Sequence, residues 1–171
     1  MNRRSILGLS AITALGLALL PGSTVAQQKS LKEQLIGTWI IVSSDSTAPD
    51  GKKEQILGPN PKGILVFDAS GQTVQVIVHP GVPKFKVNNR LKGTPEENAA
   101  AVHGTTATFG TYTVDEASKT ITVRNVGGMF PNQAGAETKR IVTSVTADEI
   151  KFTNPATAAG MRADNLWRRA K

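Results

Sequence analysis

Few side chains in this sequence could carry out catalysis, and their spacing does not favour it. The chain of 171 residues has no cysteine and two histidines, His79 and His103. Thiolate nucleophiles and thiolate metal ligands are therefore excluded. Two histidines would need a carboxylate to complete a metal site, and nothing in the spacing requires one beside them. The sequence thus predicts no metal site.

Other catalytic residue types also lack the spacing that their chemistry needs. No serine lies in a Gly-x-Ser-x-Gly turn, the motif that exposes a nucleophilic serine. Glu96 and Glu97 are adjacent in a predicted helix, so they point apart instead of forming an acid–base pair. Gly127 and Gly128 precede neither a lysine nor a helix, unlike a phosphate-binding loop. We predict no catalytic residues and no cofactor, and the sequence favours binding over catalysis.

Tyr112 and Arg140 are polar side chains that could serve a binding site. Tyr112 lies in an apolar run, and Arg140 shares a strand face with Val142, because alternate side chains of a strand point the same way. If both pointed inward, they would offer a donor and a cation to an apolar ligand that carries a carboxylate. The alternative, which we favour from the sequence alone, places Tyr112 in the core with a hydrogen-bonded hydroxyl and Arg140 in solvent.

Strands must position these side chains, because short apolar runs alternate with turns along the chain. About eight runs have the pattern of strands, over residues 37–45, 63–68, 73–79, 107–115, 120–126, 137–146, 149–153 and 165–170. No helices alternate with them, which argues against a parallel sheet. One short helix is predicted from Pro95, with Thr94 as its N-cap and Gly104 at its end. The prediction is an all-β, up-and-down antiparallel fold, either a barrel or a sandwich.

The first and last strands contain residues that could close a barrel. The first run begins Gly37-Thr38-Trp39, and the last strand contains Arg169. A barrel closes by pairing its first and last strands, which removes the exposed edges. An arginine over an indole face is a favourable cation–π contact. We therefore predict an eight-stranded barrel closed by Gly37, Trp39 and Arg169; in the simpler alternative, Trp39 is an ordinary core residue.

The first residues have the organisation of a secretory signal peptide. Arg3 and Arg4 precede an apolar run over residues 6–20, and a small-x-small site ends at Ala26. The run is too short to span a membrane. We predict a signal peptide over residues 1–26 and a barrel domain over residues 35–171. The product is expected to be periplasmic or secreted by the Sec or twin-arginine route, without stable membrane insertion after cleavage.

The net charge of +7 does not indicate a nucleic-acid partner. Basic residues are scattered, with no basic helix and no alternation of basic and aromatic side chains, so nucleic-acid binding is not expected. The expected partner is a small apolar or amphipathic molecule. The expected state is a monomer or a weak dimer.

Several motifs resemble the bacterial lipocalin-like domain family. They are Gly37-Thr38-Trp39, Gly-Pro-Asn-Pro-x-Gly at 58–63, Phe-Gly-Thr-Tyr at 109–112, Phe130-Pro131-Asn132 and the terminal Trp-x-Arg that ends at Arg169. The resemblance covers residues 35–170 and implies a calycin-type barrel with an internal pocket, to which Phe109, Phe130 and Asn132 would contribute. Family members often have tryptophan where this chain has Gln133, so one aromatic wall of the pocket is expected to be missing.

Three functions are compatible with these features. The first is a carrier whose apolar cavity opens near residues 84–104. The second is an enzyme of the cyclase or isomerase type in the same pocket, which would need a convergent polar pair with shifted pKa values. The third is a filled barrel that works through an exposed apolar patch. A cavity separates the first two from the third, and we rank the carrier first.

Overall fold

The computed structural model describes residues 29–171, and nine antiparallel strands form one sheet within that part of the chain. The strands are β1 (Gly37–Thr47), β2 (Lys53–Glu54), β3 (Lys62–Phe67), β4 (Gln72–Val78), β5 (Thr105–Asp115), β6 (Thr120–Gly128), β7 (Glu137–Val145), β8 (Glu149–Asn154) and β9 (Arg162–Arg169). The predicted signal peptide lies outside the described residues.

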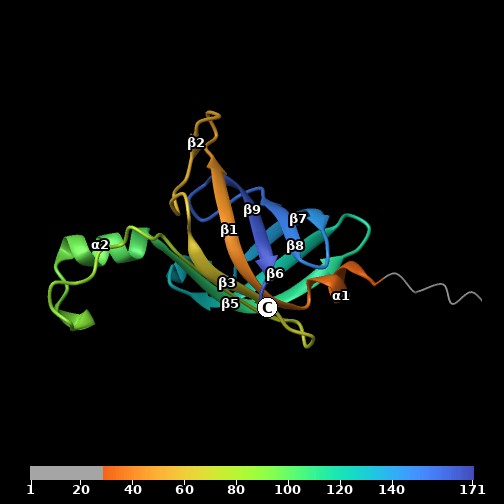
Figure 1. The fold of residues 1–171 in the computed structure, drawn as a ribbon, viewed down its shortest axis with the longest axis horizontal. Helices are drawn as coiled ribbons and strands as arrows, with labels where there is room; N and C mark the ends of the chain where they lie inside the picture. Colours follow the sequence, from red (N-terminus) through yellow and green to blue (C-terminus); the bar gives the residue numbers. More distant parts are fainter. Residues whose placement is uncertain (1–28) are drawn as a thin grey trace, which may run out of the picture.

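The sheet closes into a barrel, as the sequence predicted (Figure 1). Its order is β2-β1-β3-β4-β5-β6-β7-β8-β9, and β1 also pairs with β9. The two-residue β2 only extends the sheet beside the end of β1, so the closed barrel consists of eight strands joined up and down. All pairings are antiparallel. Of the two folds that the sequence left open, the structure is therefore the barrel and not the sandwich.

The two closing strands are longer than predicted. β1 continues to Thr47, and β9 begins at Arg162, so Ser46 pairs with Ala163 and Thr47 pairs with Arg162. The added residues are mostly polar, which gave them the character of a loop in the sequence. They pair because the opposite strand supplies the hydrogen bonds that their backbone needs.

Two short α-helices lie at different places on the barrel: α1 (Leu31–Leu35) and α2 (Pro95–His103). The 3₁₀ turns are η1 (Arg90–Lys92) and η2 (Pro131–Gln133). α1 buries Leu31 and Leu35 against one end of the barrel. Within residues 29–171, no helix has the length and apolar character needed to cross a bilayer.

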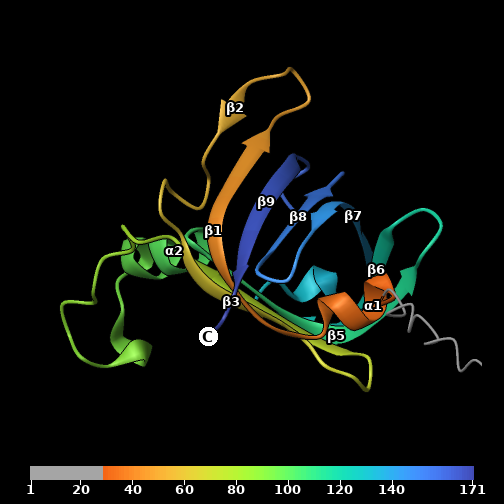
Figure 2. The ribbon, with the colours of Figure 1, turned by 45° about the vertical axis from the view of Figure 1, so that its right-hand side comes forward.

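The helix predicted after Thr94 is confirmed and projects away from the barrel (Figure 2). Thr94 is its N-cap, and the Thr94 hydroxyl accepts a hydrogen bond from the Glu97 backbone N–H at 3.2 Å. The Glu97 carboxylate in turn accepts from the Thr94 backbone N–H at 2.9 Å. This reciprocal pairing satisfies donors that have no partner within the helix. Only the end of α2 approaches the barrel.

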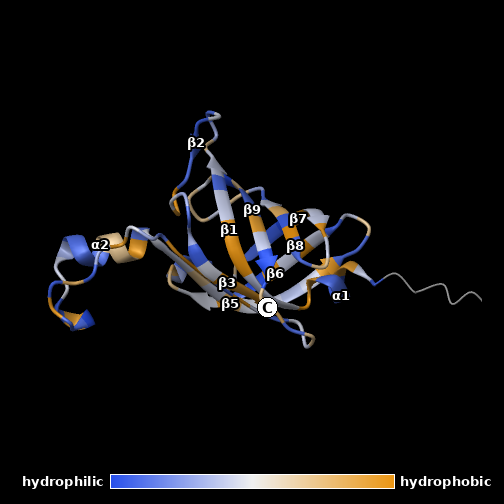
Figure 3. Cartoon of the chain, in the orientation of Figure 1, coloured by the Kyte–Doolittle hydropathy of each residue, from blue (hydrophilic) through white to orange (hydrophobic). Residues whose placement is uncertain are grey.

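Large apolar side chains fill the half of the barrel next to α1. The fully buried ones are Trp39, Trp167, Phe67, Phe152, Leu35, Leu65, Ile121, Ile150 and Val123. In Figure 3, β1 has hydrophobic colours near its start and more hydrophilic colours toward β2. The buried side chains of β1 change in the same direction, from Trp39 and Ile41 to Ser44 and Ser46, so the interior becomes more polar along the barrel axis.

Arg169 closes the barrel over Trp39, as predicted. Its guanidinium carbon lies 4.0 Å from the centroid of the Trp39 ring. The same guanidinium donates to the backbone carbonyls of Ile36, at 2.9 Å, and Gln34, at 2.8 Å. Trp39 is fully buried, and its indole N–H donates to the Leu35 carbonyl at 2.8 Å. The contact thus joins β9, β1 and the end of α1.

Gly37 makes room for this arginine. Its φ is +132°, a region that other residues rarely adopt. A Cβ at this position would lie 2.7 Å from Nη1 of Arg169. The predicted closure residues therefore meet in one cluster, and the glycine is required by both backbone conformation and space.

Replacing Trp39 with alanine should lower the free energy of unfolding by about 3–5 kcal/mol, because it removes a fully buried indole and the surface on which Arg169 lies. Urea unfolding followed by circular dichroism measures this loss. Ile40→Ala is the control, because Ile40 is the next residue and is 42% exposed. A loss below about 1 kcal/mol for Trp39→Ala would contradict the closure role.

Candidate ligand-binding cavity

A cavity of about 310 Å³ occupies the half of the barrel away from α1. All barrel strands except β3 contribute to its wall. Its mouth is formed by the segment before β3, the end of α2, the η2 turn and the β8–β9 loop. The apolar core closes the other half, so the cavity has one end inside the barrel and one end toward these loops.

The inner wall of the cavity is mainly polar. Buried polar side chains that line it are Ser44, Ser46, Gln75, Thr108, Asn125 and Asn165. Several are neighbours across the sheet, since Gln75 pairs with Thr108 and Ser44 pairs with Asn165. Because alternate residues of a strand face the same way, each strand directs such a side chain to the interior.

Arg140 lies in this wall and is 4% exposed. Its guanidinium carbon is 5.4 Å from the centroid of the Phe152 ring and 5.9 Å from that of Phe67. The rings stabilise the cation by cation–π contact, but the buried Nη1 has no hydrogen-bond partner. Arg140 therefore lies at the border between the aromatic core and the polar cavity.

Arg140 is a buried cation without a counter-ion in the described structure. The cavity wall, as the described residues form it, contains no aspartate or glutamate. No carboxylate of residues 29–171 forms an ion pair with this guanidinium. Burial lowers the pKa of Arg140 to about 10, so the group remains charged at neutral pH. The interior of the barrel is consequently positive.

The mouth of the cavity is more apolar than its inner wall. Its apolar side chains are Ile56, Leu57, Val102, Met129, Phe130 and the alanines Ala156, Ala158 and Ala159. Ile56, Val102 and Phe130 are exposed to solvent. Gln133 also lines the mouth, at the position where the family resemblance predicted a missing aromatic wall.

Of the predicted ligand residues, Arg140 and Phe130 line the cavity together. Tyr112 points inward but belongs to the apolar core, where its ring centroid is 4.8 Å from that of Phe67. Its hydroxyl donates to the Asp68 carbonyl at 2.8 Å. Burial, together with the nearby Asp68 carboxylate, raises the pKa of Tyr112. Tyr112 is thus a core residue with a satisfied hydroxyl, whereas Arg140 faces the interior and not solvent.

Phe109 and Asn132 lie away from the cavity. Phe109 is 50% exposed on the outer wall, between the inward-facing Thr108 and Gly110. A Cβ on Gly127 would lie 2.9 Å from the Phe109 ring, so this ring covers the neighbouring strand from outside. Asn132 is exposed in the η2 turn. Strand alternation separates Phe109 from the interior, and the direction of the turn separates Asn132 from it.

Sequence reasoning missed the amide side chains of the inner wall. β4 has valines at alternate positions, and hydrophobicity alone favours these valines as the buried set. The structure instead buries Thr73, Gln75 and Ile77, while Val74 is 41% exposed. Strand alternation correctly separated the two faces, but it did not say which face was inside. Asn125 and Asn165 likewise share a face with apolar neighbours, which is the one signal that could have found them.

Comparison with known proteins identifies the family. Residues 36–170 match the lipocalin-like domain family, over most of the chain. The chain belongs to this family. Lipocalins typically bind small hydrophobic ligands. A search of the curated proteins found none that matches the chain.

Solved structures that resemble this lipocalin-like barrel share little sequence with it. A lipocalin-like protein from Bacteroides uniformis is 13% identical, with 80% of this chain and 99% of that chain covered and a TM-score of 0.43. Bovine odorant-binding protein, solved with a selenium-containing odorant, is 17% identical, with 84% and 74% covered and a TM-score of 0.43. A de novo designed fluorescence-activating β-barrel is 12% identical, with 83% and 99% covered and a TM-score of 0.42.

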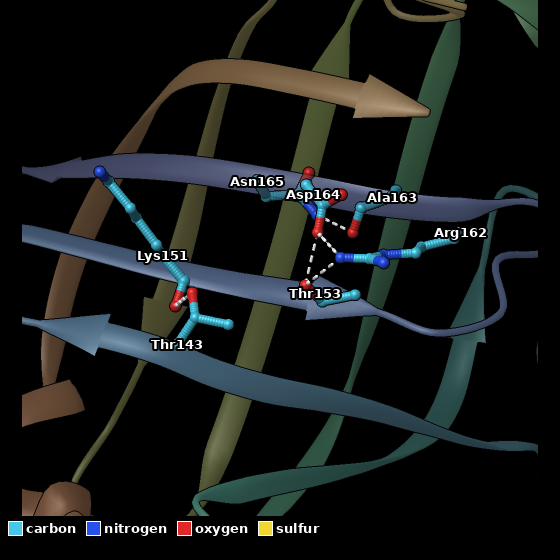
Figure 4. Close-up of polar contacts among 7 residues, drawn as sticks. All are labelled: Thr143, Lys151, Thr153, Arg162, Ala163, Asp164 and Asn165. Carbon is cyan, nitrogen blue, oxygen red and sulfur yellow. Dashed lines mark hydrogen bonds and ion pairs between the residues drawn. The ribbon is translucent and has the colours of Figure 1, made fainter. Parts of the chain in front are cut away.

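A second polar cluster of the lipocalin-like barrel faces outward (Figure 4). The Thr153 hydroxyl donates to the Asp164 carboxylate, and Arg162 donates to the same carboxylate at 2.9 Å. Burial raises the pKa of Asp164, but these two hydrogen bonds and the charge of Arg162 outweigh it, and the pKa is lowered. Ala163 and Asn165 line the cavity, so the intervening Asp164 points to the outer wall. The cluster therefore joins β8 to β9 without reaching the interior.

A larger depression, of about 420 Å³, lies beside α1 at the opposite end of the barrel. Its lining comes from the residues around α1, the β5–β6 turn and β7. His79 lines neither site, although it lies beside Gly58 and Gly104 near the cavity mouth, and its Nδ1 accepts a hydrogen bond from the Gly81 backbone N–H at 2.8 Å. Residues 29–171 contain no group of three or more side chains placed to hold a metal ion. The interior cavity is therefore the candidate site.

Replacing Arg140 with methionine should raise the free energy of unfolding by about 1–4 kcal/mol, because an apolar side chain of similar length avoids burial of an unpaired charge. Since burial lowers the folded-state pKa of Arg140 to about 10, from 12.5, folding bears this cost at every lower pH. The gain should thus be constant below about pH 9 and should shrink as the pH rises through 10. Urea unfolding at several pH values measures it.

Arg169→Met is the matched control for that experiment. The same substitution at Arg169 removes the contact with Trp39 and the hydrogen bonds to Ile36 and Gln34. It should therefore destabilise the protein. A loss of stability in both variants would show that Arg140 is compensated inside the folded barrel.

Proposed function

We propose that this lipocalin-like barrel binds one small amphipathic molecule in its interior. The observation that carries the proposal is a cavity whose inner wall is mainly polar and whose mouth is more apolar. A ligand with a polar end and an apolar body matches both parts, with its polar end innermost. Sites for small molecules commonly combine apolar walls with a few placed polar groups.

The size of the cavity supports a small ligand. Its volume of about 310 Å³ is at the lower end of ligand sites, which measure about 300–1,000 Å³. The aromatic core occupies the remaining interior, where Trp39 and Trp167 are fully buried. A longer ligand would therefore have to extend past the mouth, along exposed apolar side chains such as Phe130 and Val102.

The same observations bear on the alternative functions. A filled barrel that works through its surface would lack this cavity, although apolar side chains such as Ile64 and Val74 do lie exposed on the outer wall. A cyclase or isomerase in the same pocket stays a prediction, because it would need an acid–base pair of side chains beside the ligand. We place binding first because size and lining of the cavity both support it.

We also propose that the protein acts in the periplasm or outside the cell, as a monomer or weak dimer. The N-terminal pattern of basic residues, apolar run and small-x-small site supports export. N-terminal sequencing of the protein recovered from cell fractions of its host tests this. We expect the exported form to begin at Gln27. A chain that retains Met1 in the cytoplasmic fraction would contradict the proposal.

The first experiment on binding is native mass spectrometry of the protein purified gently from its own host. A stoichiometric small molecule, extracted and identified, would support the carrier function and give its ligand class. An empty protein that also fails to bind fluorescent amphipathic probes would contradict it.

Ala163→Phe should reduce binding of such probes by about tenfold or more, because Ala163 is 5% exposed and lines the cavity. Fluorescence titration measures the loss. Val126→Phe is the matched control, since Val126 is 63% exposed on the outer wall of β6. Thermal unfolding of both variants separates lost binding from lost folding, because overpacking alone costs about 1–3 kcal/mol. Equal binding by both variants would contradict an interior site.

A further inference from the structure

We propose that the ligand of this barrel is a monoanion, namely an amphipathic carboxylic acid whose carboxylate binds Arg140. The inference rests on the proposed interior binding and adds the charge and the orientation of the ligand. Its basis is a single buried cation that faces the cavity and has an unsatisfied donor.

Among the described residues, Arg140 lacks both a counter-ion and an acceptor for one of its donors. The side chain is 4% exposed, and its Nη1 has no hydrogen-bond partner. The rings of Phe67 and Phe152 stabilise its charge but cannot take the place of an oxygen acceptor at Nη1. Buried polar groups normally have partners, and a buried charge without one is costly. An anion in the cavity would satisfy both the charge and the donor.

The buried cation lies at the inner end of the cavity and not at its mouth. Arg140 is in the inner wall of the cavity, and its partners on the other side are the aromatic rings of the core. A charged group at the mouth would be hydrated whether or not a ligand was bound. A charge at the inner end is shielded from water, where an ion pair gains the most. The carboxylate would thus lie innermost and the apolar body would point to Phe130 at the mouth.

The rest of the inner wall carries neutral amide groups. Gln75, Asn125 and Asn165 bring amide groups to the same cavity, and two of them are held in place by their neighbours. The Asn125 amide donates to the Ala136 carbonyl at 3.2 Å, and the Asn165 amide donates to the Ala163 carbonyl at 3.3 Å. The wall therefore offers neutral hydrogen-bonding groups around one charged donor. A guanidinium among such groups suits the planar carboxylate, which it can bind with two parallel hydrogen bonds.

The charged side chains of the cavity lining determine which ligand charge they can balance. In the described part of the chain, no other arginine or lysine and no acidic residue lines the cavity, and its histidine, His103, lies exposed at the mouth. One carboxylate balances one guanidinium. A dianion such as a phosphate monoester would leave a negative charge in the barrel, and a cationic ligand would face like-charge repulsion. The lining therefore selects a monoanion over both.

The test compares three probes that share one alkyl chain, namely decanoate, 1-decanol and decyltrimethylammonium. Isothermal titration calorimetry with the unmodified protein at neutral pH gives the three dissociation constants. We expect decanoate to bind about tenfold or more tightly than decanol, as expected for a charge-assisted hydrogen bond. We expect the ammonium probe to bind most weakly. This comparison does not depend on the folding of any variant.

Variants at Arg140 then test whether this residue causes the preference for decanoate over decanol. Arg140→Met should bring decanoate down to the affinity of decanol and leave decanol unchanged. Arg140→Lys should retain part of the preference, because it keeps the charge but not the planar fork. Arg124→Met, an exposed residue on β6, is the matched control and should bind like the unmodified protein. Ala163→Phe should weaken both probes.

The outcomes separate this inference from the proposed function. Equal affinities for decanoate and decanol in the unmodified protein would overturn the proposal that the ligand is a carboxylate, but they would leave interior binding in place. A preference for decanoate that survives in Arg140→Met would also overturn it. Failure of all three probes to bind would overturn both proposals. A carboxylate ligand is supported only if the unmodified protein prefers decanoate to decanol and Arg140→Met loses that preference.

Discussion

The pairing of β1 with β9 is the constraint on which the barrel depends, because without it two long edges would be left unpaired. Arg169 fixes that pairing by lying on Trp39 while it donates to the carbonyls of Ile36 and Gln34. Gly37 leaves the space that the guanidinium needs. The cluster holds strand, strand and helix at one end of the barrel. A cavity can thereby remain in the opposite half of the barrel.

The interior is divided between an apolar core and a polar cavity. Trp39, Trp167 and their apolar neighbours fill one half, while serines and amides line the cavity in the other. Arg140 lies at the border, with aromatic rings on one side and the cavity on the other. A barrel selected only for stability would have an apolar residue at this position. The filled half provides the stability that a polar cavity with a buried cation takes away.

The fold was largely predictable because local rules sufficed for it. Alternation located the strands, Thr94 and Pro95 located the helix, and the types of Gly37 and Trp39 indicated closure. The site was predicted only in part, because alternation separates the faces of a strand without orienting them. β4 directs its valines to the outer face and buries Gln75, since β-branched residues favour strands on either face. Such a choice depends on barrel curvature and neighbours, which arise only once the sheet has closed.

The closing contact also sets an order of events during synthesis. Arg169 bonds to a carbonyl of Ile36, which lies 133 positions earlier in the chain. The ribosome makes β1 early and β9 last, at about 5–20 residues per second, so β1 waits several seconds for its partner. Until then the edge of β1 that pairs with β9 has no partner strand. A barrel closed by its last strand therefore cannot complete its hydrogen bonding until its synthesis is nearly finished.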